Sequence, residues 1–265
     1  MDLGLAERTV LVTGGSGGIG RRMVARFAAE GARVAFTYRA GKERAEVLEK
    51  EIREAGGEAL AVPMDLTDPG STTAAVDTVA PVLGPVEVLV VNASATGGPA
   101  PHPVDFVDVP AATWVPQLRT EIEGAFHTVQ AVLPGMCPGG WGRIVFMSAS
   151  IVDRGRRGEQ AYTAGKSALH GLNRSLATEL ASAGVLCNVV APGPTITEGL
   201  LPKLPPALRA AIDGRPPREA RALLDEGMPH LAFSTVDDVV NVVLFLASAA
   251  NGNVTGSVLN VAGGR

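Results

Sequence analysis

Short apolar runs alternate with longer amphipathic segments along the chain. The apolar runs have the length of buried strands and lie at 8–13, 33–38, 58–64, 86–91, 142–147, 185–190 and 257–262. Segments with the apolar spacing of an amphipathic helix lie at 21–30, 42–55, 111–133, 161–180 and 235–248, and a further helix begins near Pro69. This alternation predicts an α/β fold with a parallel sheet, whose strands are covered on both faces.

Two loops interrupt this pattern. Residues 95–110 are rich in proline and glycine and follow the fourth strand, at the carboxyl edge of the sheet where ligands of such folds bind. Residues 194–233 carry seven prolines and fragments of helix. A segment of this length inside a compact domain is usually functional. We therefore interpret 194–233 as a substrate lid within one domain that spans 1–265.

A glycine-rich turn follows the first strand directly. It reads Gly14-Gly15-Ser16-Gly17-Gly18-Ile19-Gly20 and leads into a helix and then a second strand. Glycines let the backbone approach a pyrophosphate, and a helix N-terminus attracts its negative charge. A tight structural turn is the simpler explanation for glycines alone. The strand-turn-helix-strand context favours dinucleotide binding instead.

The end of the second strand indicates which dinucleotide binds. No Asp or Glu stands there to bind a ribose 2′-hydroxyl, and Arg39 occupies the place. A guanidinium pairs with a 2′-phosphate, so the sequence predicts NADP; a solvated arginine at a strand end is the alternative. Asp65 ends the third strand, where its carboxylate would accept from an adenine amino group or cap the next helix.

A tyrosine and a lysine four residues apart carry the predicted chemistry. Tyr162 and Lys166 lie on one face of the helix that begins near Ala161, one turn apart. A phenol titrates near pH ~10, and a nearby ammonium lowers its pKa toward the range in which it transfers protons at neutrality. A chance surface pair has the same spacing, so the rest of the chain must decide between the two interpretations.

Composition and charge exclude several classes of function. Hydrophobic residues make up 46% of the chain, enough for a sizeable core, and the net charge of -4 gives no reason to expect a nucleic acid or an anionic membrane as partner. Cys137 and Cys187 are too few and too isolated for a disulfide framework or a metal site. Since the chain has no apolar run of membrane-spanning length and no signal peptide, a reducing cytoplasm is the expected location.

Four short motifs, in their order and at their separations, resemble the short-chain dehydrogenase/reductase family. They are Thr13-Gly14-x-x-x-Gly18-Ile19-Gly20, Asn92-Ala93, Tyr162-x-x-x-Lys166 and Pro192-Gly193. The resemblance covers essentially the whole chain, and Tyr38-Arg39 and the closing segment 254–264 are nearest to 3-oxoacyl-carrier-protein and polyketide ketoreductases. It implies one doubly wound, Rossmann-type domain with a seven-stranded parallel sheet, an NAD(P) cofactor and often a homotetramer.

The resemblance also implies roles for single residues. Tyr162 donates a proton to a carbonyl oxygen while hydride arrives from the nicotinamide, and Lys166 holds the ribose hydroxyls and lowers the pKa of Tyr162. The expected activity is NADPH-dependent reduction of a bulky or carrier-bound ketone. The positions expected to contact the cofactor are Gly14, Ser16, Gly18, Ile19, Gly20, Arg39, Asp65, Leu66, Asn92, Ala93, Tyr162, Lys166, Pro192, Gly193 and Thr195.

Three positions depart from the family's pattern. The serine that normally lies thirteen residues before the tyrosine is Ala149, the asparagine of the preceding helix is Glu121, and a usual glycine is Ser94. A lost hydroxyl donor to the substrate oxygen costs ~2.7–4 kcal/mol, unless Ser148 or Ser150 replaces it. Ser150 is the first candidate, because it lies beyond the pleat of the strand. Glu121 would hold a water near Lys166, or would pair with its ammonium and weaken its effect on Tyr162.

These departures keep two other functions open. A cyclase, isomerase or dehydratase would retain Tyr162 as an acid, and a non-enzyme would bind NADP as a regulatory or subunit partner. Substrate-dependent NADPH oxidation separates the reductase from both. Arg154, Arg156 and Arg157 lie in the loop 153–158 before Tyr162, where they are either solvated or steer an anionic substrate such as the phosphate of a carrier arm.

Overall fold

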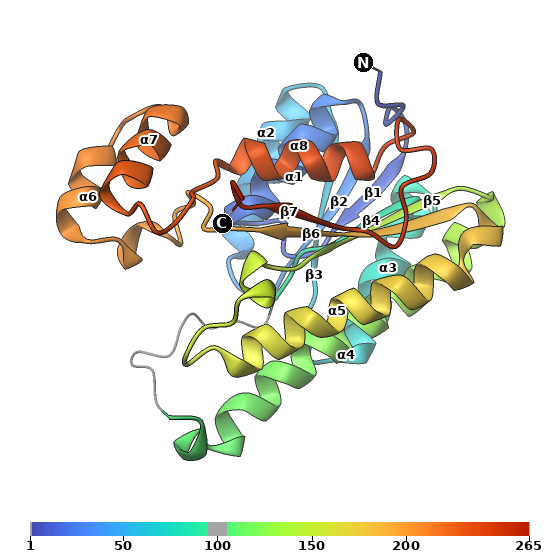
Figure 1. Cartoon of the computed structure of the whole chain (residues 1–265). Coiled ribbons are helices and arrows are strands. Elements are labelled where there is room, and N and C mark those ends of the chain that lie inside the picture. The colour runs from blue at the N-terminus through green and yellow to red at the C-terminus, as the bar shows by residue number, and fades with distance from the viewer. Residues whose placement is uncertain (1, 95–104, 265) are drawn as a thin grey trace.

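A parallel sheet runs through the middle of the molecule (Figure 1). The computed structural model describes residues 2–94 and 105–264, so most of the predicted loop 95–110 lies outside the described residues. Within them, seven strands pair in parallel in the order β3-β2-β1-β4-β5-β6-β7. The strands are β1 (Thr9–Val12), β2 (Arg33–Tyr38), β3 (Glu58–Pro63), β4 (Val88–Val91), β5 (Gly142–Met147), β6 (Val185–Pro192) and β7 (Val258–Val261). The strand order reverses between β1 and β4, and ligands of such sheets bind at the carboxyl edge near this point.

Helices cover both faces of the sheet, as the fold prediction requires (Figure 1). One face carries α1 (Gly18–Ala29), α2 (Lys42–Glu54) and α8 (Val236–Leu246). The other carries α3 (Pro69–Leu83), α4 (Ala111–Met136) and α5 (Gln160–Glu179). Short 3-10 turns are η1 (Phe106–Asp108), η2 (Cys137–Gly139), η3 (Ser150–Asp153), η4 (Ala181–Ala183) and η5 (Leu201–Lys203). In the described part of the chain, no helix combines the length and apolar character that a membrane span needs.

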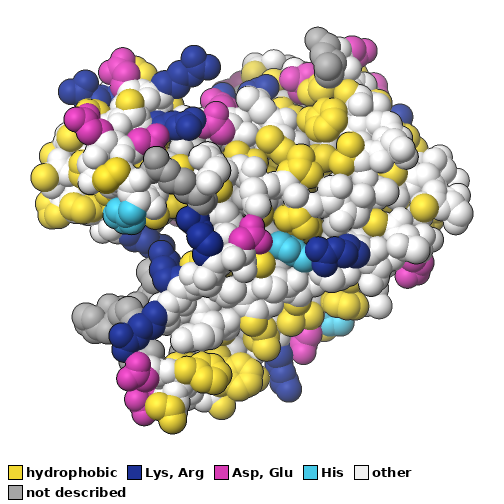
Figure 2. Space-filling model, in the orientation of Figure 1, with side chains coloured by type: hydrophobic (Ala, Val, Ile, Leu, Met, Phe, Trp, Pro, Cys, Tyr) yellow, Lys and Arg dark blue, Asp and Glu magenta, His cyan; other side chains and the backbone are white. Residues whose placement is uncertain are grey.

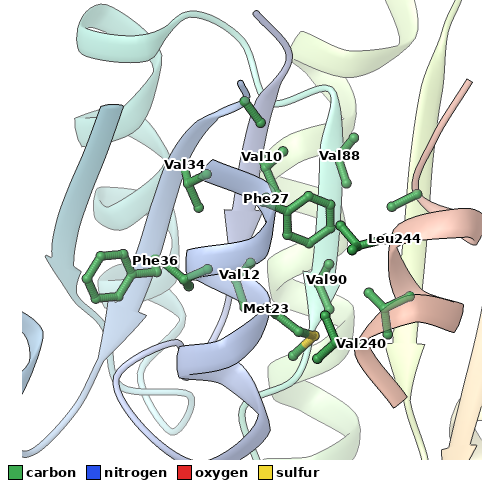
Figure 3. Packing of buried hydrophobic residues seen from close by; sticks show 14 of the residues in the cluster. Val10, Val12, Met23, Phe27, Val34, Phe36, Val88, Val90, Val240 and Leu244 are labelled. Carbon is green, nitrogen blue, oxygen red and sulfur yellow. The ribbon is translucent and has the colours of Figure 1, made fainter. Parts of the chain in front are cut away.

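Strand side chains alternate between two separate cores. Val10 and Val12 of β1 point toward α1, where Phe27 is fully buried, whereas Leu11 between them joins the core on the opposite face. Figure 3 shows Val10 and Val12 with Val88 and Val90 of β4 beneath the α1 side chains. Each large apolar side chain buried in this way contributes about 1.5–3 kcal/mol. The rigid sheet edge that results fixes the starting points of the loops that follow the strands.

α4 differs from its prediction at its end and on its buried face. The prediction ends the helix before Pro134, but it continues to Met136, whose side chain is buried in the core and holds the last turn. Helical spacing of the apolar residues predicts a buried stripe of Leu118, Ile122, Phe126, Val129 and Leu133. The stripe is right at Val129, which is buried, and wrong at Phe126, which is 44% exposed. The buried positions are instead Thr120, Glu121, Gly124, Ala125, Thr128, Val129, Val132 and Met136.

Close helix packing explains the change of face. A Cβ atom added at Gly124 would lie 3.0 Å from Leu66, and one added at Gly165 of α5 would lie 3.1 Å from Glu121. Because these glycines bring the backbones near, small residues such as Gly124 and Ala125 share the inner face of α4 with Val129, Val132 and Met136, whereas Phe126 lies outside. Other predicted boundaries shift by one to three residues; α1, for example, begins at Gly18 and not at Arg21.

The segment 194–233 forms a lobe beside the sheet (Figure 1). It contains α6 (Pro206–Ile212) and α7 (Pro217–Gly227) and has its own apolar cluster around Leu224 and Phe233, both 1% exposed or less. A parallel bridge between Thr195 and Ser234 closes its base. The lobe therefore carries a core separate from the two cores of the sheet.

Candidate active site

The glycine turn leaves the N-terminus of α1 available to a ligand. Gly17 caps α1 without a side-chain hydrogen bond, and the first turn carries no acid. A Cβ atom at Gly17 or Gly18 would meet nothing within 4 Å, whereas one at Gly20 would lie 2.3 Å from the carbonyl oxygen of Gly14. Gly20 therefore permits the tight turn, and Gly17 and Gly18 keep its outer side open. Backbone N–H groups and a bare helix end suit a pyrophosphate, so the turn fits a dinucleotide.

β4 holds this turn in place. Thr13 Oγ1 accepts hydrogen bonds from the backbone N–H groups of Asn92 and Ala93, each at 2.9 Å. The Asn92 side-chain amide donates to the carbonyl oxygens of Thr13 at 2.9 Å and Gly14 at 3.2 Å. The structure thus brings the predicted residues Gly14, Asn92 and Ala93 together and commits the Asn92 amide to shaping the turn. Of the other predicted contacts near the turn, Ser16 is half-buried and Ile19 packs against the core.

Arg39 and Asp65 lie at the same sheet edge. Arg39 is exposed after β2, and within the described residues its guanidinium makes no ion pair. Asp65 Oδ1 accepts from the backbone N–H of Thr67 at 2.9 Å and from its hydroxyl at 2.8 Å. These bonds lower the pKa of Asp65, and the charge of Arg39 lowers it further. The helix-capping interpretation of Asp65 is wrong, because Asp68 caps α3 through a 2.9 Å bond from Gly70.

Lys166 is held at the start of α5 by two protein acceptors. Its Nζ donates to the carbonyl oxygen of Met147 at 2.9 Å, at the end of β5, and forms an ion pair with Glu121 of α4. Both charged side chains are only 4% exposed. Tyr162 lies one turn earlier on the same helix and is half-buried. The predicted pair therefore occupies the carboxyl edge of the sheet, close to where β5 ends.

Glu121 and Ser94, which both depart from the family's pattern, bind each other. The Ser94 hydroxyl donates to Glu121 Oε2 at 2.7 Å, while Oε1 of the same carboxylate faces Lys166. A glycine at position 94 would offer no hydroxyl to this buried anion, and buried charges need such partners. The prediction that Glu121 pairs with Lys166 is confirmed. The link to Ser94 was missed, although two coupled departures were the available signal.

The environment of Tyr162 opposes the predicted lowering of its pKa. Burial, together with the charges of Glu121 and Glu159, raises the pKa of Tyr162 to about 12, and only Arg156 opposes this direction. The expectation that Lys166 lowers this pKa is wrong, because burial and the two carboxylates outweigh any such effect. Tyr162 is consequently a fully protonated phenol at neutral pH.

The serines beside Ala149 have different surroundings. Ser148 Oγ lies 2.8 Å from His170 Nε2 and donates to the Lys166 carbonyl oxygen at 3.3 Å, so it binds α5. Ser150 starts η3 and is 6% exposed, and its hydroxyl has no hydrogen-bond partner among the described residues. His170 was missed by the sequence interpretation. It lies one turn beyond Lys166, in register with Tyr162, and this spacing was the available signal.

The last predicted contacts lie where β6 ends. The Gly193 N–H donates to Val261 of β7 at 2.9 Å, and a Cβ atom at Gly193 would lie 3.1 Å from Ala262. Pro192 pairs with Val261 in the same sheet, and the Thr195 hydroxyl donates to the Gly193 carbonyl at 3.0 Å. These residues lead directly into the lobe 194–233. Leu66 is further away along the edge, packed against Gly124 of α4.

Basic side chains gather beside the lobe. Figure 2 shows Lys and Arg side chains around the hollow between the α6–α7 lobe and the lower helices. In the loop before Tyr162, Arg156 pairs with Glu159, and Arg157 pairs with Asp105 at 2.7 Å. Arg154 is exposed as well. Two of the three loop arginines are thus partly neutralised by neighbouring carboxylates.

Comparison with known proteins finds relatives that are similar to this chain in sequence and in structure. A model of the short chain dehydrogenase family matches residues 8–203. The chain is 31% identical over 257 residues to 3-oxoacyl-[acyl-carrier-protein] reductase FabG of Staphylococcus aureus (strain Mu50 / ATCC 700699), covering 97% of each. It is 31% identical over 260 residues to nodulation protein G of Azospirillum brasilense, covering 98% of each. Among solved structures, a blue fluorescent protein from a metagenomic library, in complex with NADPH, is 35% identical with a TM-score of 0.80 over 98% of both chains.

Proposed function

The chain belongs to the short-chain dehydrogenase/reductase family, and from this premise we propose that it reduces a ketone to an alcohol with NADPH. One observation carries the proposal: a protonated Tyr162 stands one helical turn from a Lys166 ammonium that Met147 and Glu121 hold in place. A phenol in that position is a proton donor for a carbonyl oxygen that gains negative charge.

Each residue of the candidate site has a separate role in such a reaction. NADPH, when bound, supplies the hydride. The open N-terminus of α1 would hold its pyrophosphate, and Arg39 would hold the 2′-phosphate. Tyr162 gives its proton to the carbonyl oxygen, and we assign to the Ser150 hydroxyl the second hydrogen bond to that oxygen. Lys166 has one further N–H, which would bind the ribose hydroxyls.

The preference for NADP rests on charge at one strand end. Arg39 has no ion-pair partner among the described residues, and no carboxylate ends β2 to repel a phosphate. The solved structure that is 35% identical was determined in complex with NADPH, which supports the same choice.

For the substrate we propose a 3-oxoacyl group on a carrier. Support comes from the relatives described as 3-oxoacyl-[acyl-carrier-protein] reductases and from the basic loop 154–157, which would attract the phosphate of a carrier arm. We assign the lobe 194–233 as the lid over this substrate, because it continues directly from Gly193 at the sheet edge.

We further propose a cytoplasmic homotetramer. The outer face of α4 exposes Trp114 by 37% and Phe126 by 44%, while its inner face is lined by small residues. Aromatic side chains in that setting favour a contact with a second copy. Mass measurement in solution tests the subunit number, and a monomer at micromolar concentration would contradict it.

A second candidate function follows from Ala149. The family's usual serine is absent there, and a similar solved structure is described as a fluorescent protein that binds NADPH. The chain would then bind NADPH without turning it over. Incubation with 3-oxoacyl thioesters and NADPH separates the two functions: falling NADPH absorbance that needs Tyr162 supports the reductase. Enhanced NADPH fluorescence without consumption for every ketone tried would favour the binding protein.

A further inference from the structure

A buried ionic arrangement that involves Glu121, Lys166 and Ser94 lies next to Tyr162. Glu121 of α4 has one carboxylate oxygen on Lys166 and the other on the hydroxyl of Ser94, at 2.7 Å. Lys166 is also bound to the Met147 carbonyl at 2.9 Å. Every charge in the arrangement has a partner, and both ionic side chains are 4% exposed. Water therefore screens the pair little, and its geometry is fixed by three separate elements.

The pair changes what Tyr162 experiences. An isolated ammonium would stabilise the phenolate, but here the Glu121 carboxylate offsets the ammonium and itself acts against the phenolate. The charged groups that face Tyr162 are Glu121 from α4, Lys166 from its own helix, and Glu159 and Arg156 from the preceding loop. Glu159 and Arg156 pair with each other, so they too largely cancel.

We propose that Glu121 is a positioning residue that acts through Lys166: it fixes the ammonium and cancels its charge, so that Tyr162 stays a phenol and serves carbonyl reduction. The inference rests on the proposed reductase function. In the reverse reaction Tyr162 would have to accept a proton from the alcohol as a phenolate, so alcohol oxidation by this protein requires alkaline pH. Ketone reduction does not require alkaline pH, because the phenol form of Tyr162 is the proton donor.

Tyrosine titration tests the inference without any substrate. The chain has only two tyrosines, so Tyr38→Phe leaves Tyr162 as the sole phenol. Ultraviolet absorbance of tyrosinate is followed up to pH ~10.5, just above the ordinary phenol pKa, with circular dichroism to confirm that the fold persists. We expect no titration in the Tyr38→Phe protein. Adding Glu121→Gln should raise the tyrosinate fraction at a given pH by about tenfold or more, the effect of one pKa unit.

Two further variants keep the test decisive. Glu121→Asn restores the residue type of the family's pattern and replaces Glu121→Gln if that protein does not fold. Glu159→Gln is the matched control, because it removes a carboxylate near Tyr162 that does not touch Lys166. An equal change in the Glu159 and Glu121 variants, or no change in the Glu121 variants, would overturn the inference.

Activity gives an independent readout. The rising limb of the pH profile for alcohol oxidation should move to lower pH in Glu121→Asn, with ketone reduction at neutral pH changed less. Failure of all ketones to be reduced, with the titration shift present, would remove the proposed function and leave the role of Glu121 intact. Reduction together with an unchanged titration would remove the role of Glu121 alone.

Discussion

Ser148 at the end of β5 and His170 on α5 are joined by a hydrogen bond of 2.8 Å between Oγ and Nε2. The bond ties the strand end before Ala149 to the helix that carries Tyr162 and Lys166. Ser148 also donates to the backbone of Lys166. The hydroxyl of Ser148 therefore has a structural role, and two predictions follow from it.

The first prediction concerns how the stability of the fold depends on pH. Burial lowers the pKa of His170 below its ordinary value; Asp153 opposes this and Arg174 adds to it. The folded state thus favours the neutral imidazole. The resulting contribution to the free energy of unfolding is complete above the pKa that His170 has in the unfolded chain, and it is lost as the pH falls through the lower pKa of the folded state. We expect Tm to fall between pH ~7 and pH ~5, and to fall less in His170→Gln. His127→Gln on α4 is the matched control; an equal flattening there would contradict the assignment.

The second concerns the missing serine. Ser150→Ala should lower kcat by about 10²-fold with NADPH affinity unchanged, because it removes a hydrogen bond to the reacting oxygen. Ser148→Ala should lower kcat much less and reduce Tm, since its hydroxyl binds His170. Tyr162→Phe should be more severe than either. If Ala149→Ser raises reduction many-fold and Ser150→Ala has no effect, the native site lacks a hydroxyl donor and altered chemistry is the better interpretation.

Cofactor preference provides a third test. NADPH should bind more tightly than NADH by about tenfold or more, and Arg39→Ala should erase the difference by weakening NADPH alone. Titration of cofactor fluorescence measures both constants. Arg44→Ala is the control, because Arg44 begins α2 nearby and its guanidinium lies against Gly41. Comparable constants for NADPH and NADH in the unaltered protein would refute the preference.

The basic loop 154–157 leads to a fourth prediction. Neutralising Arg156 and Arg157 together should raise KM for a carrier-bound substrate at low salt, and the difference should shrink as salt screens the field. Because both arginines already pair with carboxylates, we expect a modest change in KM and an unchanged kcat. Lys50→Gln together with Arg53→Gln, on α2 across the sheet, removes the same number of charges and controls for total charge. An unaltered KM at low salt would show that the loop is merely solvated.

The sequence predicted the sheet and most helices because strand and helix periodicities differ and each apolar run had one consistent interpretation. It failed on α4, where glycines and small residues form the inner face and aromatic residues lie outside. The spacing of apolar residues does not show which face of a helix is buried when small residues on one face let a neighbouring element approach closely.

The sequence predicted which residues of the candidate site lie together but not their electrostatics. Motif spacing brought Tyr162 and Lys166 together, and the nature of Glu121 implied its ion pair. Burial of Tyr162, which sets the direction of its pKa, depends on α4, α5 and the loop between β5 and α5 at once. No local pattern reports that burial, whereas the bonds of Ser94 and His170 each left a signal in the sequence, in the two departures at 94 and 121 and in the spacing of His170 from Lys166.

The separate core of the lobe 194–233 has a consequence for how substitutions combine. Its apolar cluster does not merge with those of the sheet, and the chain enters and leaves it side by side at Thr195 and Ser234. Substitutions in distant, independent cores combine almost additively. Substitutions within this unit should accordingly change the free energy of unfolding independently of substitutions at the glycine turn and the Glu121–Lys166 pair.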